Sequence, residues 1–185
     1  MKLNLFKILI ALPAILMVTM VAGCSGQGQK TVKTGDTVSV DYIGTFTNGT
    51  VFDTSIESVA KEAGIYNSQR PYEPLTFTVG GGQMIQGFDK AVVGMEAGES
   101  KNITLQPEEA YGQRDPSKVI EVPIQQLQAN GIDPEVGMQL ITQSGGMAEI
   151  TAVNESSGNA TIDFNHPMAG NTLQFKITVK DIQSK

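Results

Sequence analysis

Few side chains in this sequence could carry out covalent or metal chemistry. Cys24 is the only cysteine and His166 the only histidine among its 185 residues. An intramolecular disulfide needs two cysteines, and a zinc site or a Cys/His catalytic pair needs Cys and His residues that meet in the fold. One residue of each type is too few for an intramolecular disulfide or a Cys/His zinc site, and we predict no Cys/His catalytic pair. We predict neither a bound metal nor a cofactor.

Binding of phosphate groups is also poorly supported. Residues 80–82 are three glycines and Gly87 follows, but the spacing is not that of G-x-G-x-x-G. A P-loop would need Lys followed by Ser or Thr where this chain has Phe88. The formal net charge of −6 argues against a nucleic-acid partner, because phosphate backbones attract basic surfaces. We interpret the glycine run as a chain reversal that leads into a helix, and we predict no nucleic-acid binding.

Cys24 lies at the end of an uncharged apolar segment. Residues 8–23 contain no charged residue and follow Lys2 and Lys7, which is the pattern of a secretory signal. The segment is shorter than the roughly 20 residues that a straight helix needs to span a bilayer. Val21-Ala22-Gly23-Cys24 resembles a prokaryotic lipobox, which implies cleavage before Cys24 and lipid on its sulfur. An uncleaved anchor and a buried structural thiol stay open as alternatives.

This interpretation makes residues 1–23 a signal peptide and residues 24–33 a lipidated N-terminus and flexible linker. Removal of the signal peptide takes away two lysines and no acidic residue, so the net charge changes from −6 to −8. Anionic lipids repel such a chain, and attachment would therefore depend on acyl chains instead of a basic patch. We expect an exported protein anchored to the outer face of the cytoplasmic membrane.

The following residues have the pattern of an antiparallel sheet with few helices. Alternating apolar residues predict strands at 37–46, 50–53, 75–79, 99–105 and 173–179. Asn48-Gly49 predicts a tight hairpin between the first two. Thr54-Ser55-Ile56-Glu57 has the spacing of a capping box, which predicts a short helix at 55–63 that ends at Gly64. Residues 65–74 contain two prolines and are expected to form an exposed loop.

A second helix is predicted after the glycine run. Its apolar residues recur at spacings of three and four, at Ile85, Phe88, Val92 and Met95. These elements predict an α+β fold in which an antiparallel sheet packs on one helix.

Residues 113–164 have their own turns and their own apolar residues. A strand at 119–122 precedes Pro123, which opens a helix, and strands follow at 138–142, 147–153 and 160–164. About fifty residues are too many for a loop. We predict a small, mostly β inserted domain at 113–164, with a body made of 34–112 together with 165–185. The lone His166 is expected to brace the return from the insert to the body.

Several separated motifs resemble those of FKBP-type peptidyl-prolyl isomerases. They are Tyr42, residues 49–55 (GTVFDTS), residues 83–88 (QMIQGF), Ala110-Tyr111-Gly112 and Leu173-Gln174-Phe175. Residues 165–170 (NHPMAG), after the insert, are similar to the SlyD-type branch, whose extra domain lies in the flap. The resemblance covers nearly all of residues 31–185. It implies a half-barrel sheet wrapped on one helix, with a prolyl pocket between them.

The resemblance also implies which residues form the site. The catalytic residues carried over are Tyr42, Phe52, Asp53, Ile85, Tyr111 and Phe175. Further substrate-binding residues are Leu75, Met84 and Phe88 in the body and, as an apolar client surface on the insert, Val119, Ile120, Val122, Met138, Leu140 and Met147. Tyr111 would donate its hydroxyl to a substrate carbonyl, and Asp53 would orient the pocket through Tyr42 or the peptide. Taken singly, the aromatic residues also fit core packing, and Asp53 also fits a turn or a helix cap.

Two functions remain open from the sequence. The first is an exported, membrane-tethered prolyl isomerase that acts on proline-containing unfolded or partly folded polypeptides, with the insert binding clients as a chaperone does. The second is a binding-only chaperone or surface adaptor that has the same fold and little catalysis. The complete set of pocket residues favours the isomerase, and we expect a monomer.

Overall fold

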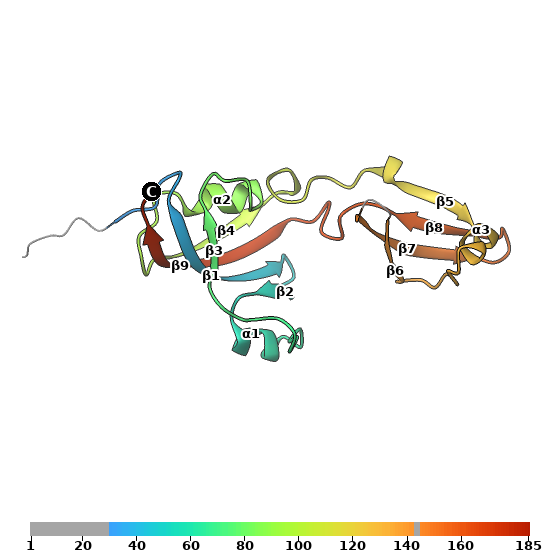
Figure 1. Cartoon of the computed structure of the whole chain (residues 1–185), viewed down its shortest axis with the longest axis horizontal. Helices are drawn as coiled ribbons and strands as arrows, with labels where there is room; N and C mark the ends of the chain where they lie inside the picture. Colours follow the sequence, from blue (N-terminus) through green and yellow to red (C-terminus); the bar gives the residue numbers. More distant parts are fainter. Residues whose placement is uncertain (1–29, 143–144) are drawn as a thin grey trace, which may run out of the picture.

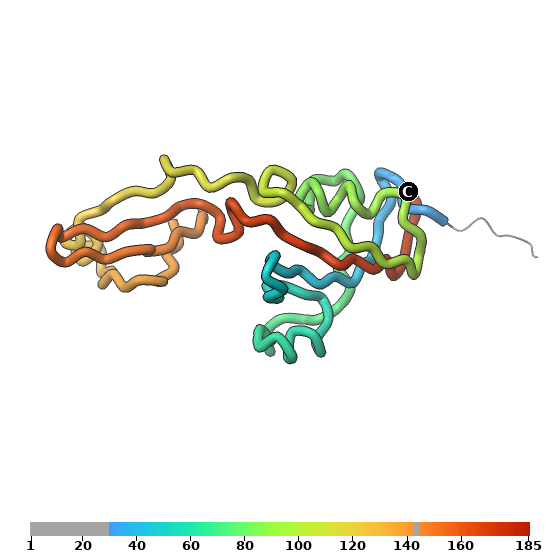
Figure 2. Tube along the Cα trace, turned by 180° about the vertical axis from the view of Figure 1, so that it is seen from behind, coloured from blue at the N-terminus to red at the C-terminus, as the bar shows by residue number. Residues whose placement is uncertain are grey.

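The structure, a computed structural model, describes residues 30–142 and 145–185 and consists of two lobes joined by a neck (Figure 1). The body lobe contains β1–β4, β9, α1 and α2, and the distal lobe contains β5–β8 and α3. The neck consists of the segments 112–118 and 164–172, which run side by side between the lobes (Figure 2). The predicted signal peptide, Cys24 and the predicted linker up to residue 29 lie outside the described residues. Within the described ranges, no helix is long and apolar enough to cross a membrane.

The body sheet is built around two long strands. β1 (Thr37–Phe46) pairs along its length with β9 (Leu173–Gln183), whose other edge pairs with β4 (Ser100–Leu105). The first half of β1 also pairs with β3 (Leu75–Thr78), and its second half with β2 (Val51–Thr54). All these pairings are antiparallel, as predicted. β9 continues beyond the predicted end at residue 179.

The alternating residues of β1 point into the body core. Val38 and Val40 are fully buried, and α2 (Gln86–Val92) covers this face with Phe88 and Val92. Burial of each such side chain contributes about 1.5–3 kcal/mol. Gly87 allows the helix to come close, since a Cβ atom there would lie 2.4 Å from the Leu105 side chain. The predicted packing of one helix on the sheet is therefore present.

The helix α1 (Glu57–Glu62) is shorter than predicted, and the predicted capping box is wrong. Its N-cap is Ile56, which makes no side-chain cap. The Thr54 hydroxyl instead donates to the Tyr42 carbonyl at 2.7 Å and accepts the Ile56 N–H at 3.1 Å. The Thr54 side chain, which the spacing predicted as a helix cap, therefore links β2 to β1. Gly64 follows the helix with a φ of 72°, as predicted.

Val32 packs into the body, although we predicted it within the linker. It is 1% exposed. The Val32 N–H donates to the Met95 carbonyl, and the Val32 carbonyl accepts the Gly94 N–H, both at 2.8 Å. The ordered body therefore begins before residue 34.

The distal lobe has its own sheet and its own core. Its antiparallel strands lie in the order β5 (Val119–Pro123), β8 (Asn159–Asp163), β7 (Met147–Asn154) and β6 (Gln139–Ile141). The helix α3 (Ile124–Ala129) buries Leu127 against Ile150 and Ile162, and Pro123 is its N-cap, as predicted. Among the described residues, this buried cluster shares no member with the body core.

Hydrogen bonds join the two segments of the neck. The Gly170 N–H donates to the Gly112 carbonyl at 2.9 Å. Asn165, which is buried, accepts the Asp115 N–H and donates to the Asp115 carbonyl, both at 2.9 Å. Because these buried polar groups are paired, they avoid the cost of desolvation. The neck therefore connects the lobes as a bonded pair of segments.

Candidate functional site

One pocket of the body brings together all nine body residues that the sequence predicts for the site. Its volume is about 220 Å³. The lining residues are Tyr42, Phe52, Asp53, Leu75, Gln83, Met84, Ile85, Phe88, Tyr111 and Phe175. They come from four strands, from α2 and the turn that precedes it, and from the segment after the 3₁₀ turn Pro107–Glu109. Only Gln83 is not among the predicted pocket residues.

Aromatic rings pack edge to face around this pocket. The Phe175 ring meets Phe52 at 5.7 Å and Phe88 at 5.3 Å between ring centroids, with interplanar angles of 89° and 85°. The Tyr42 ring meets Phe88 at 6.0 Å and 89°. Each such pair contributes about 0.5–1.5 kcal/mol beyond burial. The rings therefore hold one another in place and give the pocket a rigid apolar wall.

Gly44 of β1 makes room for two of these rings. A Cβ atom at this position would lie 2.7 Å from the Phe52 ring and 3.0 Å from the Phe175 ring. Any side chain there would displace a ring or the strand, and such overpacking costs about 1–3 kcal/mol. Alternation marks residue 44 as an inward position, but it does not show which rings approach it. This contribution to the pocket therefore cannot be predicted from the sequence pattern.

A hydrogen-bonded group of three side chains forms the polar side of the pocket. The Tyr42 hydroxyl donates to Asp53 Oδ2 at 2.7 Å, which is the contact we expected. The Arg70 guanidinium donates from Nη1 to Asp53 Oδ1 at 2.5 Å and from Nη2 to the Tyr42 hydroxyl at 2.9 Å. Burial, followed by the hydrogen bond to Asp53, raises the pKa of Tyr42 to about 12. Tyr42 is therefore a neutral phenol at physiological pH.

Arg70 is the polar residue of this group that the sequence did not predict. It lies in the loop that we predicted only as exposed, and its side chain is 42% exposed. The pairing with Asp53 depends on the tertiary path of this loop. The spacing of residues along the chain does not indicate that Arg70 and Asp53 are close. The one available signal is chemical, because a carboxylate beside an apolar pocket needs a partner.

Tyr111 lies at the rim of the pocket and is 37% exposed. Burial and the nearby Asp53 carboxylate raise the pKa of Tyr111 above its usual value, so its hydroxyl stays protonated and able to donate. Its ring stacks on His166, with 4.0 Å between centroids and an interplanar angle of 8°. His166 Nδ1 accepts the Met168 N–H at 3.1 Å, which agrees with a bracing role in the chain return.

The distal residues predicted for client binding lie outside this pocket, and most are half-buried. Ile120 is 43% exposed and Val119 is half-buried. Those that pack against the distal core are Val122, Met138 and Leu140.

Other apolar side chains of the distal lobe are more exposed. The exposed fractions are 83% for Ile141, 67% for Val136 and 56% for Met147. Of these three, only Met147 was expected. Successive residues of a strand point to opposite faces, so the half-buried Leu140 places its neighbour Ile141 outward.

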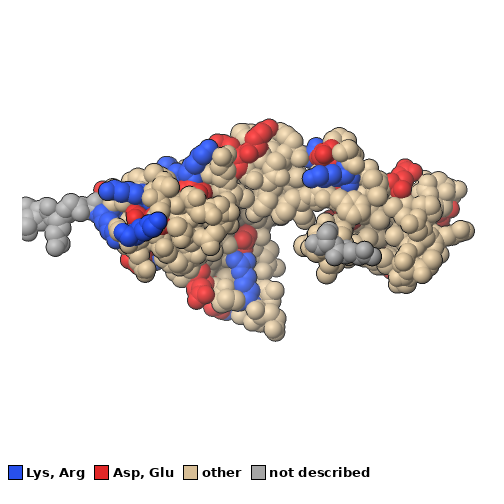
Figure 3. Space-filling model, turned by 45° about the horizontal axis from the view of Figure 1, so that its top comes forward, with Lys and Arg blue, Asp and Glu red and all other residues tan. Residues whose placement is uncertain are grey.

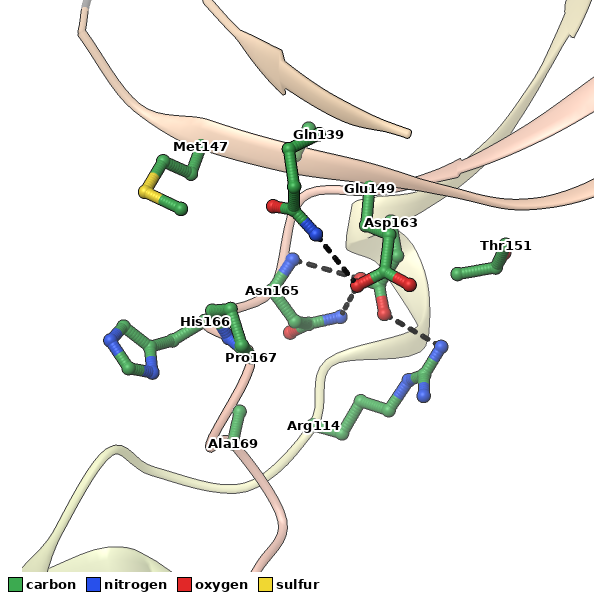
Figure 4. Close-up of a pocket in the computed structure, with 11 residues that line it drawn as sticks. Arg114, Gln139, Met147, Glu149, Thr151, Asp163, Asn165, His166, Pro167 and Ala169 are labelled. Carbon is green, nitrogen blue, oxygen red and sulfur yellow. Dashed lines mark hydrogen bonds and ion pairs between the residues drawn. The ribbon is translucent and has the colours of Figure 1, made fainter. Parts of the chain in front are cut away.

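A second hollow lies where the neck meets the distal lobe (Figure 4). It encloses about 160 Å³ and is lined in part by charged and amide side chains. Asp163 pairs with Arg114 at 2.6 Å and accepts from Asn165 at 2.7 Å. The Gln139 amide donates to Glu149 at 3.1 Å. Because these groups already bind one another, the body pocket is the stronger candidate for a substrate site.

Comparison with known proteins agrees with this geometry. Residues 28–180 match the family described as FKBP-type peptidyl-prolyl cis-trans isomerase. The chain is 47% identical over 152 residues to the short-type peptidyl-prolyl cis-trans isomerase of Methanocaldococcus jannaschii, which covers 82% of this chain and 94% of that protein. It is 36% identical over 129 residues to the isomerase SlyD of Helicobacter pylori, which covers 67% and 69%. The family, the fold class and the enzyme class predicted from the sequence are confirmed.

Proposed function

The chain belongs to the FKBP-type peptidyl-prolyl cis-trans isomerases, and we propose that the body pocket is its isomerase site. The family and its relatives establish the reaction, which is the cis-trans isomerisation of X-Pro bonds in polypeptides. One observation carries the assignment of the site. A single pocket of about 220 Å³ gathers every body residue to which the family motifs assign a role.

The reaction requires rotation about a bond and breaks none. Rotation about a peptide C–N bond crosses about 18–20 kcal/mol, because resonance stabilises the planar amide. Water favours the dipolar planar form, and an apolar pocket removes that water. Groups that bind the twisted peptide more tightly than the planar one lower the barrier without a nucleophile. The rings of the pocket and the Tyr111 hydroxyl are suited to this mechanism.

The pocket residues divide into an apolar and a polar group. The residues that enclose the proline ring are Phe52, Ile85, Phe88 and Phe175. Tyr111 donates its hydroxyl to a substrate carbonyl as the peptide twists. Asp53 transfers no proton in this account, and instead it keeps the polar side of the pocket in place through Tyr42 and Arg70.

A protease-coupled assay with an X-Pro tetrapeptide tests the assignment. The whole chain in detergent micelles should accelerate cis-trans exchange above the uncatalysed rate, and Phe52→Ala should lose most of that acceleration. Ile120→Ala, on the distal lobe, is the matched control and should leave turnover unchanged. A wild-type rate equal to the uncatalysed rate would leave the binding-only chaperone as the function.

We further propose that the distal lobe binds unfolded clients. The three large apolar side chains with the greatest exposure among the described residues, Ile141, Val136 and Met147, all lie on this lobe, and exposed apolar patches are typical of interaction surfaces. Methionine adapts to differently shaped partners because its side chain is flexible and polarisable. This supports a surface that accepts many unfolded sequences.

The charge of the distal lobe favours basic clients. Residues 119–163 contain six acidic residues and no Lys or Arg. In Figure 3 the visible face of this lobe is mostly uncharged, with scattered acidic side chains, whereas basic side chains are seen on the body and the neck. Opposite charges steer encounter and suppress wrong partners. Apolar segments flanked by Lys or Arg are therefore the clients that fit best.

Substitution of the exposed apolar residues tests client binding. Ile141→Ser combined with Met147→Ser should weaken binding of an unfolded, proline-containing protein and leave tetrapeptide turnover unchanged. Gln125→Ser, on the exposed side of α3, is the control. Unchanged client affinity in the double variant would contradict the proposal.

We also propose that the protein is exported and acts as a monomer tethered by lipid on Cys24, with residues 113–164 inserted as a separate domain. The support is the uncharged segment 8–23 followed by the lipobox-like Val-Ala-Gly-Cys. Cys24→Ser should release the protein from the membrane fraction or block its processing. Carbonate-resistant association with the N-terminus retained would instead support an uncleaved anchor.

A further inference from the structure

The only histidine of the chain lies against the rim of the isomerase pocket. Its ring is nearly parallel to that of Tyr111, 8° apart, at 4.0 Å between centroids. Tyr111 lines the body pocket, whereas His166 does not line it and instead lines the hollow below the distal lobe. The stacked pair therefore connects the site to the neck.

The Tyr111 ring has few other restraints. It is 37% exposed, and among the described residues its hydroxyl forms no hydrogen bond. The hydroxyl can therefore donate to a substrate. Because it has no hydrogen-bond partner in the protein, it also does not hold the ring in one orientation. An exposed aromatic side chain with no other restraint samples several rotamers. Among the described residues His166 is the only aromatic partner of Tyr111, and the stack limits this motion.

His166 is itself held in one orientation. Its Nδ1 accepts the Met168 N–H at 3.1 Å. The two chain segments that carry the rings are joined by the hydrogen bond from the Gly170 N–H to the Gly112 carbonyl at 2.9 Å. The position of His166 is therefore fixed relative to the residue that follows Tyr111.

We infer that His166 is a positioning residue of the isomerase, which holds the Tyr111 ring so that its hydroxyl meets the substrate carbonyl. The inference rests on the proposed role of Tyr111 as the hydrogen-bond donor. His166 touches neither the substrate nor the pocket interior, and it acts only through Tyr111.

The hydrogen bond to Met168 makes this function sensitive to acid. Nδ1 can accept only when it carries no proton, and partial burial lowers the pKa of His166, so the ring is neutral near pH 7. The charged groups that share its hollow are Arg114, Glu149 and Asp163, and Figure 4 shows the ring turned away from Arg114 and Asp163. Tyr111 lies on the stacked face. Protonation therefore breaks the bond to Met168 and frees the ring from the orientation that this bond fixes.

The test is a double-mutant cycle in the whole chain, in detergent micelles, with an X-Pro tetrapeptide. His166→Ala should lower kcat/KM roughly two- to tenfold at neutral pH, the range that corresponds to an aromatic pair. Added to Tyr111→Phe, it should cause no further loss, because both changes remove the same donor. His166→Phe keeps the stack and should retain neutral-pH turnover. Phe164→Ala removes an exposed ring from the same return and is the control.

A pH profile gives a second readout. Because burial lowers the pKa of His166, wild-type turnover should fall only at a pH below the ordinary histidine value of about 6.5, and His166→Phe should lack this fall although Glu149 and Asp163 remain. Additive losses in the cycle, or the same acid limb in His166→Phe, would overturn the inference while leaving the enzyme active. Absence of wild-type turnover would overturn the proposed function together with this inference.

Discussion

The body lobe and the distal lobe differ in where they place their large apolar side chains. The body turns its phenylalanine rings inward, and Phe52, Phe88 and Phe175 pack edge to face around a pocket. The distal lobe buries a small cluster and leaves Ile141 and Met147 exposed. Charge separates them too, because residues 119–163 have six acidic and no basic residues, whereas the rest of the chain from residue 30 has 13 acidic and 11 basic.

This difference follows from what each lobe has to do in our account. Stabilisation of a twisted peptide needs groups held in one geometry, since small displacements weaken binding of the transition state. Capture of many unfolded sequences needs exposed side chains that adapt to each of them. A rigid pocket and an adaptable surface are hard to build around one hydrophobic core. In this protein the pocket belongs to the body lobe and the exposed surface to the distal lobe, and each lobe has its own core.

Cavity formation in each core is expected to give the largest effects. Phe88→Ala removes a ring that is 1% exposed and contacts Tyr42 and Phe175, and it should cost about 3–5 kcal/mol of unfolding free energy. It should also abolish most tetrapeptide turnover. Ile150→Ala, fully buried in the distal core, should destabilise that lobe by about 2–5 kcal/mol and leave this turnover intact. Denaturant unfolding measures the stability of each variant, and the peptide assay measures its turnover. Loss of turnover in Ile150→Ala would contradict the independence of the two lobes.

Two carboxylates paired with arginine give the next comparison. Asp53 pairs with Arg70 in the pocket, and Asp163 pairs with Arg114 at the neck. Hydrogen bonds to a charged group contribute about 1.5–3 kcal/mol, and less here because Asp53 is 36% exposed. Asp53→Ala should therefore reduce kcat/KM by roughly tenfold. Asp163→Ala should leave tetrapeptide turnover nearly unchanged, and equal losses would show that the neck shapes the active site.

Tyr111→Phe should have a smaller effect. It removes one neutral hydrogen bond, worth about 0.5–1.5 kcal/mol, and so reduces kcat/KM roughly two- to tenfold. Tyr66→Phe, on an exposed ring of the body loop, is the control. An unchanged rate in Tyr111→Phe would remove Tyr111 from the mechanism.

The titration of Tyr42 tests its hydrogen bonds with Asp53 and Arg70 on the polar side of the pocket. Its pKa of about 12 lies above the ordinary 10.0, so the phenol stabilises the fold below pH 10 and this contribution is lost between about pH 10 and pH 12. Ultraviolet absorbance can follow the four tyrosines, because the chain has no tryptophan. Tyr42→Phe should remove a late component of that titration. A profile unchanged by the substitution would contradict the network with Asp53 and Arg70.

The sequence could predict what depends on periodicity and on family motifs. Alternation located the strands of both lobes, and the motifs named nine residues that meet in one pocket. What it missed depends on tertiary approach. Arg70 reaches Asp53 only because a loop returns across the sheet, and Gly44 matters only because two rings meet above it.

Local spacing also misled where a side chain had a competing partner. Thr54 has the position of a helix cap, but its hydroxyl binds the Tyr42 carbonyl of the neighbouring strand. Leu140 and Met138 are apolar and were expected on a client surface, but they pack against the distal core and leave Ile141 outside.

The separation of catalysis from client capture is tested most directly by removal of the distal lobe. The Phe164 N–H donates to the Lys118 carbonyl at 3.0 Å, so an Asn-Gly turn in place of residues 119–163 can join these residues and keep the neck, Tyr111 and His166. Circular dichroism would establish that the body is folded. Turnover of a tetrapeptide should stay within about twofold of wild type, whereas catalysis on an unfolded protein should fall at least about tenfold, because the client is no longer held near the pocket. Equal losses on both substrates would contradict the account.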